Sequence, residues 1–198
     1  VLFRSAGSDV RGMKTSAVEQ GGDYVINGTK HFISHADHAD FVILFAATGE
    51  EAGPRGTKKL ITAFLVDKGT PGFEVRSGYK NVSHRGYNNC ILEFNDCRVP
   101  KSQILGQVHQ GFEVANSWLG ATRLQVAATC LGRAERALDL AMQWSVERKQ
   151  FGQQIGKFQG VSFKLADMAL ELRAAELLTL EAAWKLDRKS TRLNSSHT

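Results

Sequence analysis

The sequence predicts an α+β protein: an antiparallel β-barrel or sandwich domain followed by two long antiparallel helices of an incomplete four-helix bundle. Of the 198 residues, 42% are hydrophobic, which is enough to bury a sizeable core. All three prolines and 13 of the 19 glycines lie in residues 1–106, where they separate short β-type runs. From Gln110 onward proline is absent, and apolar residues recur every three or four positions, which is the spacing of one helix face.

Four apolar runs indicate strands in the first half: residues 24–26, 41–45, 61–66 and 90–94. Regular turn signals between the runs, without any helical stretch, favour antiparallel pairing. An Asn-Gly pair between strand-like runs is typical of a hairpin turn, and Asn27-Gly28 is such a pair. We therefore expect a turn at Asn27-Gly28 and a strand that begins within residues 30–34. The β-domain is expected to cover residues 6–106.

Two helical patterns fill residues 107–186, with a glycine-containing break over residues 152–160. The first apolar face consists of Leu124, Ala127, Leu131, Ala134, Leu138, Ala141 and Ser145. The second consists of Phe163, Ala166, Leu170, Ala174, Leu177, Leu178 and Ala182. Two helices are too few to close a four-helix bundle, so we expect an incomplete domain with an exposed apolar helix face.

The formal charge of +5, from 25 basic and 20 acidic residues, raises the question of a nucleic-acid partner. When back-translated, both ends of the chain can be encoded by opposite strands of one short-read library adaptor. We therefore expect residues 1–5 and 187–198 to derive from that adaptor, with Asp187 ambiguous. Without the four basic residues of these ends, 21 basic residues remain against 20 acidic ones, or against 19 if Asp187 is also removed. A basic nucleic-acid-binding module is thus disfavoured, and no apolar run approaches the roughly 18 residues of a membrane span.

The cysteines and histidines do not show the spacing of a metal site. Cys90, Cys97 and Cys130 are expected to be buried free thiols, which favours a reducing compartment: the cytoplasm, or the mitochondrial matrix of a eukaryote. One polar cluster consists of His31, His35, Asp37, His38 and Asp40. Because this stretch is typical of a strand followed by a turn, its side chains would not converge, and we expect no metal.

Three short features could bind a ligand. The loop Ala6-Gly7-Ser8-Asp9 can offer backbone N–H groups and a hydroxyl to a phosphate. Phe32 and Ser34 share one face of the expected strand, which suits a flat heteroaromatic ligand, although a core Phe beside a surface Ser is the alternative. Arg148 and Phe151 lie at a helix end, where the guanidinium could reach an external phosphate or simply face solvent.

In order and spacing, these segments resemble the acyl-CoA dehydrogenase family over residues 6–186. The resemblance is carried by Ala6-Gly7-Ser8-Asp9-Val10, Asn27-Gly28-Thr29-Lys30-His31-Phe32-Ile33-Ser34, Gly111-Phe112, Arg123, Arg148-Lys149-Gln150-Phe151-Gly152 and Phe158-Gln159. It implies a flavoprotein with a central β-barrel and a C-terminal four-helix domain, assembled as a dimer of dimers. This chain would hold the barrel and two of the four helices.

The resemblance also implies site residues, with FAD as cofactor and an acyl-CoA thioester as substrate. Ser8 would contact the flavin pyrophosphate and the acyl-CoA, Phe32 would stack near the isoalloxazine ring, and Ser34 would hydrogen-bond near flavin N5. Three further residues would reach the FAD of a neighbouring subunit: Arg148, Phe151 and Gln159. Arg123 would lie beside the substrate and the catalytic carboxylate.

The implied reaction removes a proton α to the thioester and transfers the β-hydrogen as hydride to FAD, with an electron-transfer flavoprotein as acceptor. The family's usual glutamate base would lie beyond residue 186, and the alternative position before Arg123 holds Thr122, so we name no base. Phe32 and Ser34 stand where many relatives have Trp and Thr, which keeps the aromatic plane and the hydroxyl. A flavin-dependent oxidase or monooxygenase on the same scaffold is the alternative activity.

Overall fold

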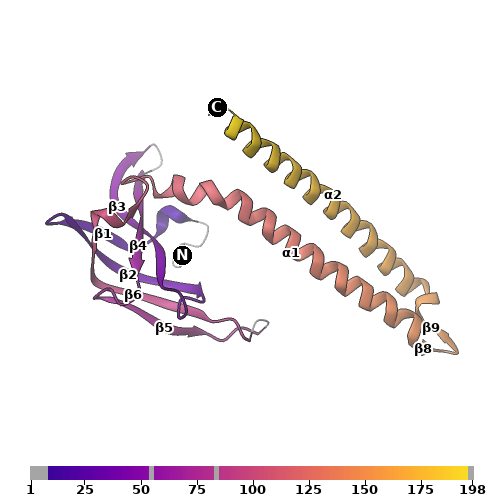
Figure 1. The fold of residues 1–198 in the computed structure, drawn as a ribbon. Coiled ribbons are helices and arrows are strands. Elements are labelled where there is room, and N and C mark those ends of the chain that lie inside the picture. The colour runs from indigo at the N-terminus through magenta and orange to yellow at the C-terminus, as the bar shows by residue number, and fades with distance from the viewer. Residues whose placement is uncertain (1–8, 54–55, 83–84, 196–198) are drawn as a thin grey trace. The chain divides into compact units, whose positions relative to one another are not determined.

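A computed structural model describes residues 9–53, 56–82 and 85–195, and it contains a curled β-sheet and two long helices (Figure 1). The chain divides into two compact units between Ser117 and Trp118, inside the first long helix, and each unit is described by itself. The strands and helices are β1 (Ser16–Gln20), β2 (Asp23–Ser34), β3 (Phe41–Gly53), β4 (Gly56–Asp67), β5 (Phe73–Tyr79), β6 (Asn89–Pro100), β7 (Ile104–Leu105), α1 (Gly111–Glu147), β8 (Lys149–Gln150), β9 (Gln153–Gln154) and α2 (Gln159–Ser195).

The first unit is built on a seven-stranded sheet in the order β5-β6-β2-β1-β3-β4-β7. Every pairing in it is antiparallel except the short parallel contact of β1 with β3 at Ser16 and Ala47. The sheet curls into a half-barrel whose inner face holds the core, where the Phe73 and Phe94 rings stack with centroids 4.8 Å apart. The predicted fold class, an antiparallel β-domain followed by two helices, is confirmed.

Two turn-type residue pairs near the start of the sheet, Gly21-Gly22 and Asn27-Gly28, have different conformations. Gly21 and Gly22 form the tight turn between β1 and β2, with φ values of +63° and +94° that suit a two-residue hairpin. The predicted turn at Asn27-Gly28 is wrong, because both residues lie inside β2 at a bulge in its pairing with β6. Gly28 has φ +141°, and a Cβ added to Gly28 would lie 2.7 Å from the Cα atom of Thr15. Residues 30–34 therefore end a strand rather than begin one.

A second bulge lies at the end of β2. Lys30 pairs with Leu92 and Ile33 pairs with Cys90, so the two residues between them oppose a single residue of β6. Phe32 has φ +56°, a left-handed conformation that a bulge accommodates. As a result, Lys30 and Ile33 are buried while Phe32 and Ser34 are exposed.

The second unit consists of the remainder of α1, the β8–β9 hairpin and α2, which runs back alongside α1 (Figure 1). The predicted break over residues 152–160 is confirmed, since Gln150 and Gln153 pair in the hairpin and α2 begins at Gln159. The helix continues to Ser195, through most of the segment assigned to an adaptor, and the origin of that segment stays a prediction. Among the described residues, no helix is long and apolar enough to cross a bilayer.

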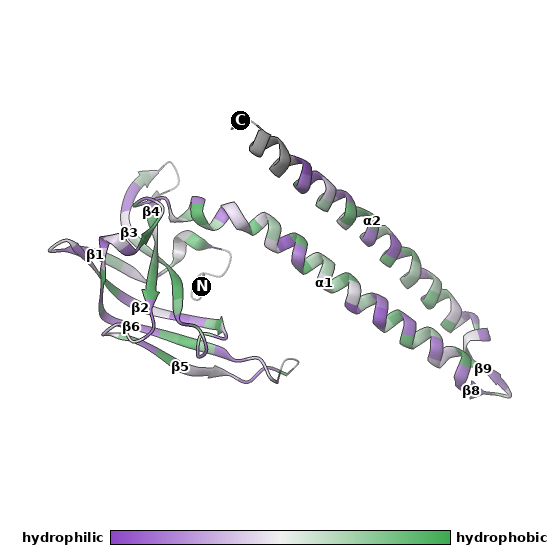
Figure 2. Ribbon diagram, in the orientation of Figure 1, coloured by the Kyte–Doolittle hydropathy of each residue, from purple (hydrophilic) through white to green (hydrophobic). Residues whose placement is uncertain are grey.

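Much apolar surface of the two helices stays exposed in this chain. α2 lines the groove toward α1 with Met168, Leu172 and Ala175, whereas Leu170 of the predicted apolar face is 71% exposed. Figure 2 shows hydrophobic residues distributed along α1 and along the coloured part of α2. Cys90 and Cys97 are buried as predicted, but Cys130, on α1 in the second unit, is exposed. The expectation of an exposed apolar helix face is confirmed.

Candidate functional site

The half-barrel presents Phe32 and Ser34 on its surface at the end of β2. Phe32 is 49% exposed, and one face of its ring stacks on Tyr79, with centroids 4.6 Å apart and planes 23° from parallel. The Tyr79 hydroxyl lies 3.1 Å from Nδ1 of His31. Tyr79 is therefore held by the stack on Phe32 and by this hydrogen bond to His31. The spacing in the sequence predicted that Phe32 and Ser34 share one face and left a core Phe32 as the alternative, whereas both are exposed. Nothing in the sequence indicated Tyr79, which lies at the end of β5.

Ser34 receives a short hydrogen bond from the hydroxyl of Tyr87. The Tyr87 ring also meets the His35 ring edge to face, with centroids 4.5 Å apart. Sequence reasoning missed Tyr87. The only available signal was that Tyr79 and Tyr87, two of the three tyrosines in the chain, flank the loop between β5 and β6.

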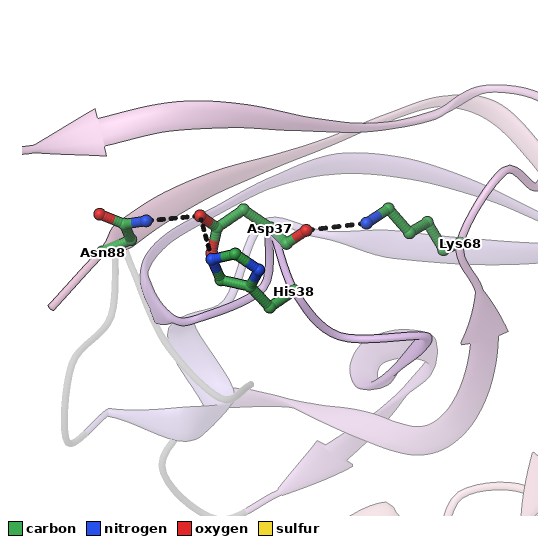
Figure 3. A network of polar contacts seen from close by, with 4 residues as sticks. All are labelled: Asp37, His38, Lys68 and Asn88. Carbon is green, nitrogen blue, oxygen red and sulfur yellow. Dashed lines mark hydrogen bonds and ion pairs between the residues drawn. The ribbon is translucent and has the colours of Figure 1, made fainter.

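A polar network anchors Asn88, the residue after Tyr87 (Figure 3). Asn88 Nδ2 donates to Asp37 Oδ2 at 2.5 Å, and Lys68 Nζ donates to the Asp37 carbonyl oxygen at 2.7 Å. The backbone N–H of His35 donates to the Asn88 carbonyl at 2.9 Å. Desolvation raises the pKa of Asp37, but the Asn88 hydrogen bond and nearby His38 outweigh it, so the pKa is lowered and Asp37 stays ionised at neutral pH.

A cavity of about 620 Å³ opens beside this network. Its lining includes Tyr79, Tyr87, Asp37 and the basic residues Lys80 and Arg85. The third basic residue of the lining, Arg76, is paired with Glu93 at 2.8 Å and is therefore neutralised. The cavity lining is mixed in polarity and contains more basic than acidic side chains.

Lys30 is a buried cation that sequence reasoning also missed. Its side chain points to the inner face of the half-barrel, and its ammonium has the Sδ atom of Met13 as a weak partner at 4.0 Å. Burial lowers the pKa of Lys30 to about 8. Desolvation likewise raises the pKa of the buried Cys97 thiol to about 11, so this thiol is not a nucleophile at neutral pH.

The histidine cluster around the same turn has other partners. His31 contacts Tyr79, His35 contacts Tyr87, and His38 lies 3.5 Å from Asp37. In the parts of the chain that the structure describes, no three histidine, cysteine or carboxylate side chains gather as ligands for a metal.

The helical unit places its candidate residues at two separate positions. Arg148, Phe151 and Gln159 gather where α1 ends and α2 begins, and Phe151 is 94% exposed at the hairpin with φ +50°. Arg123 lines a groove of about 390 Å³ between the two helices, with Leu124 and Leu178 among its neighbours. Arg123 and Arg148 are 25 residues apart, which is about 37 Å of helix rise. Ser8 lies outside the described residues.

Comparisons with known proteins agree over both units. Residues 4–97 match the model of the acyl-CoA dehydrogenase middle domain, and residues 109–196 match that of the acyl-CoA dehydrogenase C-terminal domain. The chain is 41% identical over 183 residues to the probable acyl-CoA dehydrogenase YngJ of Bacillus subtilis, covering 92% of this chain and 47% of that protein. It is 40% identical over 184 residues to CarC, a subunit of the caffeyl-CoA reductase-Etf complex of Acetobacterium woodii, covering 93% and 48%.

The fold is similar to that of a solved relative. Butyryl-CoA dehydrogenase from Megasphaera elsdenii superposes with a TM-score of 0.84 at 38% identity, covering 95% of this chain and 49% of that one. The chain thus spans about half the length of the relatives that it matches. Because both units match consecutive domains of one family at about 40% identity, the chain belongs to the acyl-CoA dehydrogenase family.

Proposed function

We propose that the protein containing this chain binds FAD and dehydrogenates an acyl-CoA thioester between its α and β carbons. The observation that carries the proposal is the paired exposure of Phe32 and Ser34 at the end of β2, in a chain of this family. An aromatic plane beside a hydroxyl donor fits a flat heteroaromatic ring that has hydrogen-bond acceptors at its edge.

Arg148 offers a second feature that fits FAD, a cation for its pyrophosphate. Arg148 is exposed at the end of α1, and within the described residues no carboxylate forms an ion pair with its guanidinium. A guanidinium matches a pyrophosphate through paired N–H donors, and the aromatic ring of Phe151 lies on the same turn. When bound, FAD would accept the hydride, while Phe32 would stack against the ring and Ser34 would donate a hydrogen bond to its edge.

Arg123 is proposed to lie beside the thioester. The groove around it has apolar walls that suit an acyl chain, and no carboxylate belongs to its lining among the described residues. A base strong enough to remove the α proton must therefore come from another part of the protein, and we assign none.

The separation of the helical residues supports a homo-oligomer. Because about 37 Å of helix rise separates Arg123 from Arg148, the two side chains would not contact the same flavin in one subunit. We therefore place Arg148, Phe151 and Gln159 against the FAD of a neighbouring subunit, in a dimer of dimers. Ser8 is proposed to contact the flavin pyrophosphate and the acyl-CoA.

An electron-transfer flavoprotein is the proposed acceptor, supported by the Etf complex in the name of CarC, and the cytoplasm is the proposed compartment. CarC is named as a reductase and YngJ as a probable dehydrogenase, so the physiological direction is a second point to test.

The test is to express the protein from its intact gene and record its absorbance before and after anaerobic addition of acyl-CoA thioesters. We expect flavin bands that bleach with a thioester and recover with an electron-transfer flavoprotein. Recovery with O2 and stoichiometric hydrogen peroxide would instead indicate an oxidase. Absence of flavin, or flavin that no thioester bleaches, would refute the proposal.

A matched pair of variants localises the site. Phe32 and Phe41 are exposed to a similar degree, 49% and 53%, and both lie in the half-barrel. Phe32→Leu should lower flavin affinity about tenfold, the order expected when an aromatic stacking partner is removed, whereas Phe41→Leu should not. Equal effects of the two substitutions would place the flavin elsewhere.

A further inference from the structure

Ser34 is exposed, and its hydroxyl accepts a hydrogen bond from the Tyr87 hydroxyl. In a hydrogen bond between two hydroxyl groups, one group donates its proton and the other accepts it. The accepting hydroxyl can still donate its own proton to a further acceptor. The direction of the hydrogen bond between Tyr87 and Ser34 therefore decides what Ser34 can do toward a ligand.

Tyr87 is the donor in this pair. A phenol is also a stronger acid than an aliphatic alcohol, and this favours the same direction. Once the Ser34 oxygen accepts from Tyr87, its own proton is available, and the Ser34 hydroxyl donates no hydrogen bond to another side chain within the described residues. Hydrogen bonds in a chain polarise one another, so the bond from Tyr87 strengthens Ser34 as a donor.

The loop holds Tyr87 in place for this contact. The neighbouring Asn88 is fixed through its side chain to Asp37 and through its carbonyl to the backbone of His35, as Figure 3 shows for the side-chain bond. The ring of Tyr87 packs edge to face on His35. Backbone and side chain of the same segment are therefore anchored to the turn that follows β2.

We propose that Tyr87 is a positioning residue that holds the Ser34 hydroxyl as a hydrogen-bond donor toward the bound flavin. This inference rests on the proposed flavin-binding function. It extends the site from β2 to the β5–β6 loop and assigns a role to a residue outside the segments that carry the family resemblance.

The test uses the flavin-loaded protein and its apoprotein with three variants: Tyr87→Phe, Ser34→Ala and the double variant. Tyr87→Phe removes the hydroxyl and keeps the ring on His35. We expect it to weaken FAD binding by about fivefold to tenfold, measured by calorimetric titration of the apoprotein, and to shift the flavin absorption bands. The same substitution should do nothing further when Ser34 is already Ala, because Tyr87 acts through Ser34.

Tyr24→Phe is the matched control, since it removes a phenol hydroxyl from the same strand, β2, at a ring that packs on Phe64 in the core. It should leave the flavin bands in place. The inference is overturned if Tyr87→Phe matches the wild type, if its effect persists in the Ser34→Ala background, or if Tyr24→Phe shifts the bands equally. A wild-type protein that binds no flavin overturns the proposed function, and this inference with it. An unchanged Tyr87→Phe in a flavin-binding protein overturns only the inference.

Discussion

Replacing Lys30 by Met should stabilise the half-barrel at neutral pH, although it removes a side chain from the segment that carries the family resemblance. Lys30 is 1% exposed, and within the described residues no carboxylate is paired with its ammonium. A buried charge without a partner costs stability, because desolvation of the ion is not repaid. Methionine has nearly the same length and shape, so the substitution removes the charge without opening a cavity.

The size of the effect follows from the pKa of Lys30. Burial lowers this pKa from 10.5 to about 8, and the difference corresponds to about 3 kcal/mol of lost stability while the ammonium is charged. Below pH 8 both folded and unfolded states are protonated, and the full cost is present. Between pH 8 and 10.5 the unfolded state binds more protons than the folded state, so the stability of the wild type rises with pH. Lys30→Met should therefore add up to about 3 kcal/mol at pH 7 and progressively less above pH 8.

Thiol labelling measures the stability of the half-barrel rather than that of the helices. All three tryptophans lie at positions 118, 144 and 184, so tryptophan fluorescence reports the helices. Cys90 and Cys97 are buried on β6 and become reactive only when the sheet opens, whereas the exposed Cys130 is replaced by Ser to remove its signal. The labelling rate at increasing urea, corrected for the intrinsic reactivity of the thiol at each pH, gives the free energy of opening.

Lys59→Met is the control. Lys59 is half-buried and donates to the Met13 carbonyl oxygen at 2.7 Å, so its removal should cost about 1 kcal/mol. The reasoning would be refuted if Lys30→Met destabilised the sheet as much as Lys59→Met, or if wild-type stability did not rise between pH 8 and 10.5. Either result would mean that the ammonium has a strong partner in solution.

Three further outcomes are expected. Gly78→Ala should unfold β5 or cost more than about 3 kcal/mol, seen as early labelling of the sheet thiols, because the new Cβ would lie 1.5 Å from the Asn89 carbonyl oxygen. Asp37→Asn should make the melting temperature fall less steeply as the pH is lowered. The stabilising contribution of ionised Asp37 is present in the wild type at neutral pH and disappears as the pH falls through its lowered pKa. An unchanged dependence of the melting temperature on pH in acid would contradict this. At pH 7 a thiol reagent should label Cys130 within the mixing time and leave Cys97 intact in the folded protein, as mass spectrometry of the digest would establish.

The change from strand to helix was predictable because proline and glycine content and apolar periodicity change near the same residue. The turn at Asn27-Gly28 was not, because Asn-Gly suits any backbone with a positive φ, and here the pair serves a bulge instead of a hairpin. The Asn27 side chain bonds Asp96 of β6 in both directions, as acceptor at 2.9 Å and as donor at 3.1 Å. A contact between residues 69 positions apart cannot be inferred from local sequence.

The candidate site was predictable to the extent that it lies on one strand. Phe32 and Ser34 are two residues apart, and strand alternation puts them on one face. Tyr79 reaches the same face from the end of β5 and Tyr87 from the segment before β6, because β2 and β5 both pair with β6 in this register. A lone Tyr in a loop has no periodicity, so its role depends on tertiary contacts.

The bulge at the end of β2 explains how one short segment serves both the core and the site. In a regular strand, Lys30, Phe32 and Ser34 would share one face. In this protein Lys30 faces the core with Leu92, while Phe32 and Ser34 face outward, because the extra residue shifts the alternation by one position. The left-handed backbone at Phe32 is thus the local device that separates a buried ammonium from an exposed aromatic ring two residues away. If the bulge were lost, either Lys30 would leave the core or Phe32 and Ser34 would enter it, so core and site depend on the same backbone conformation.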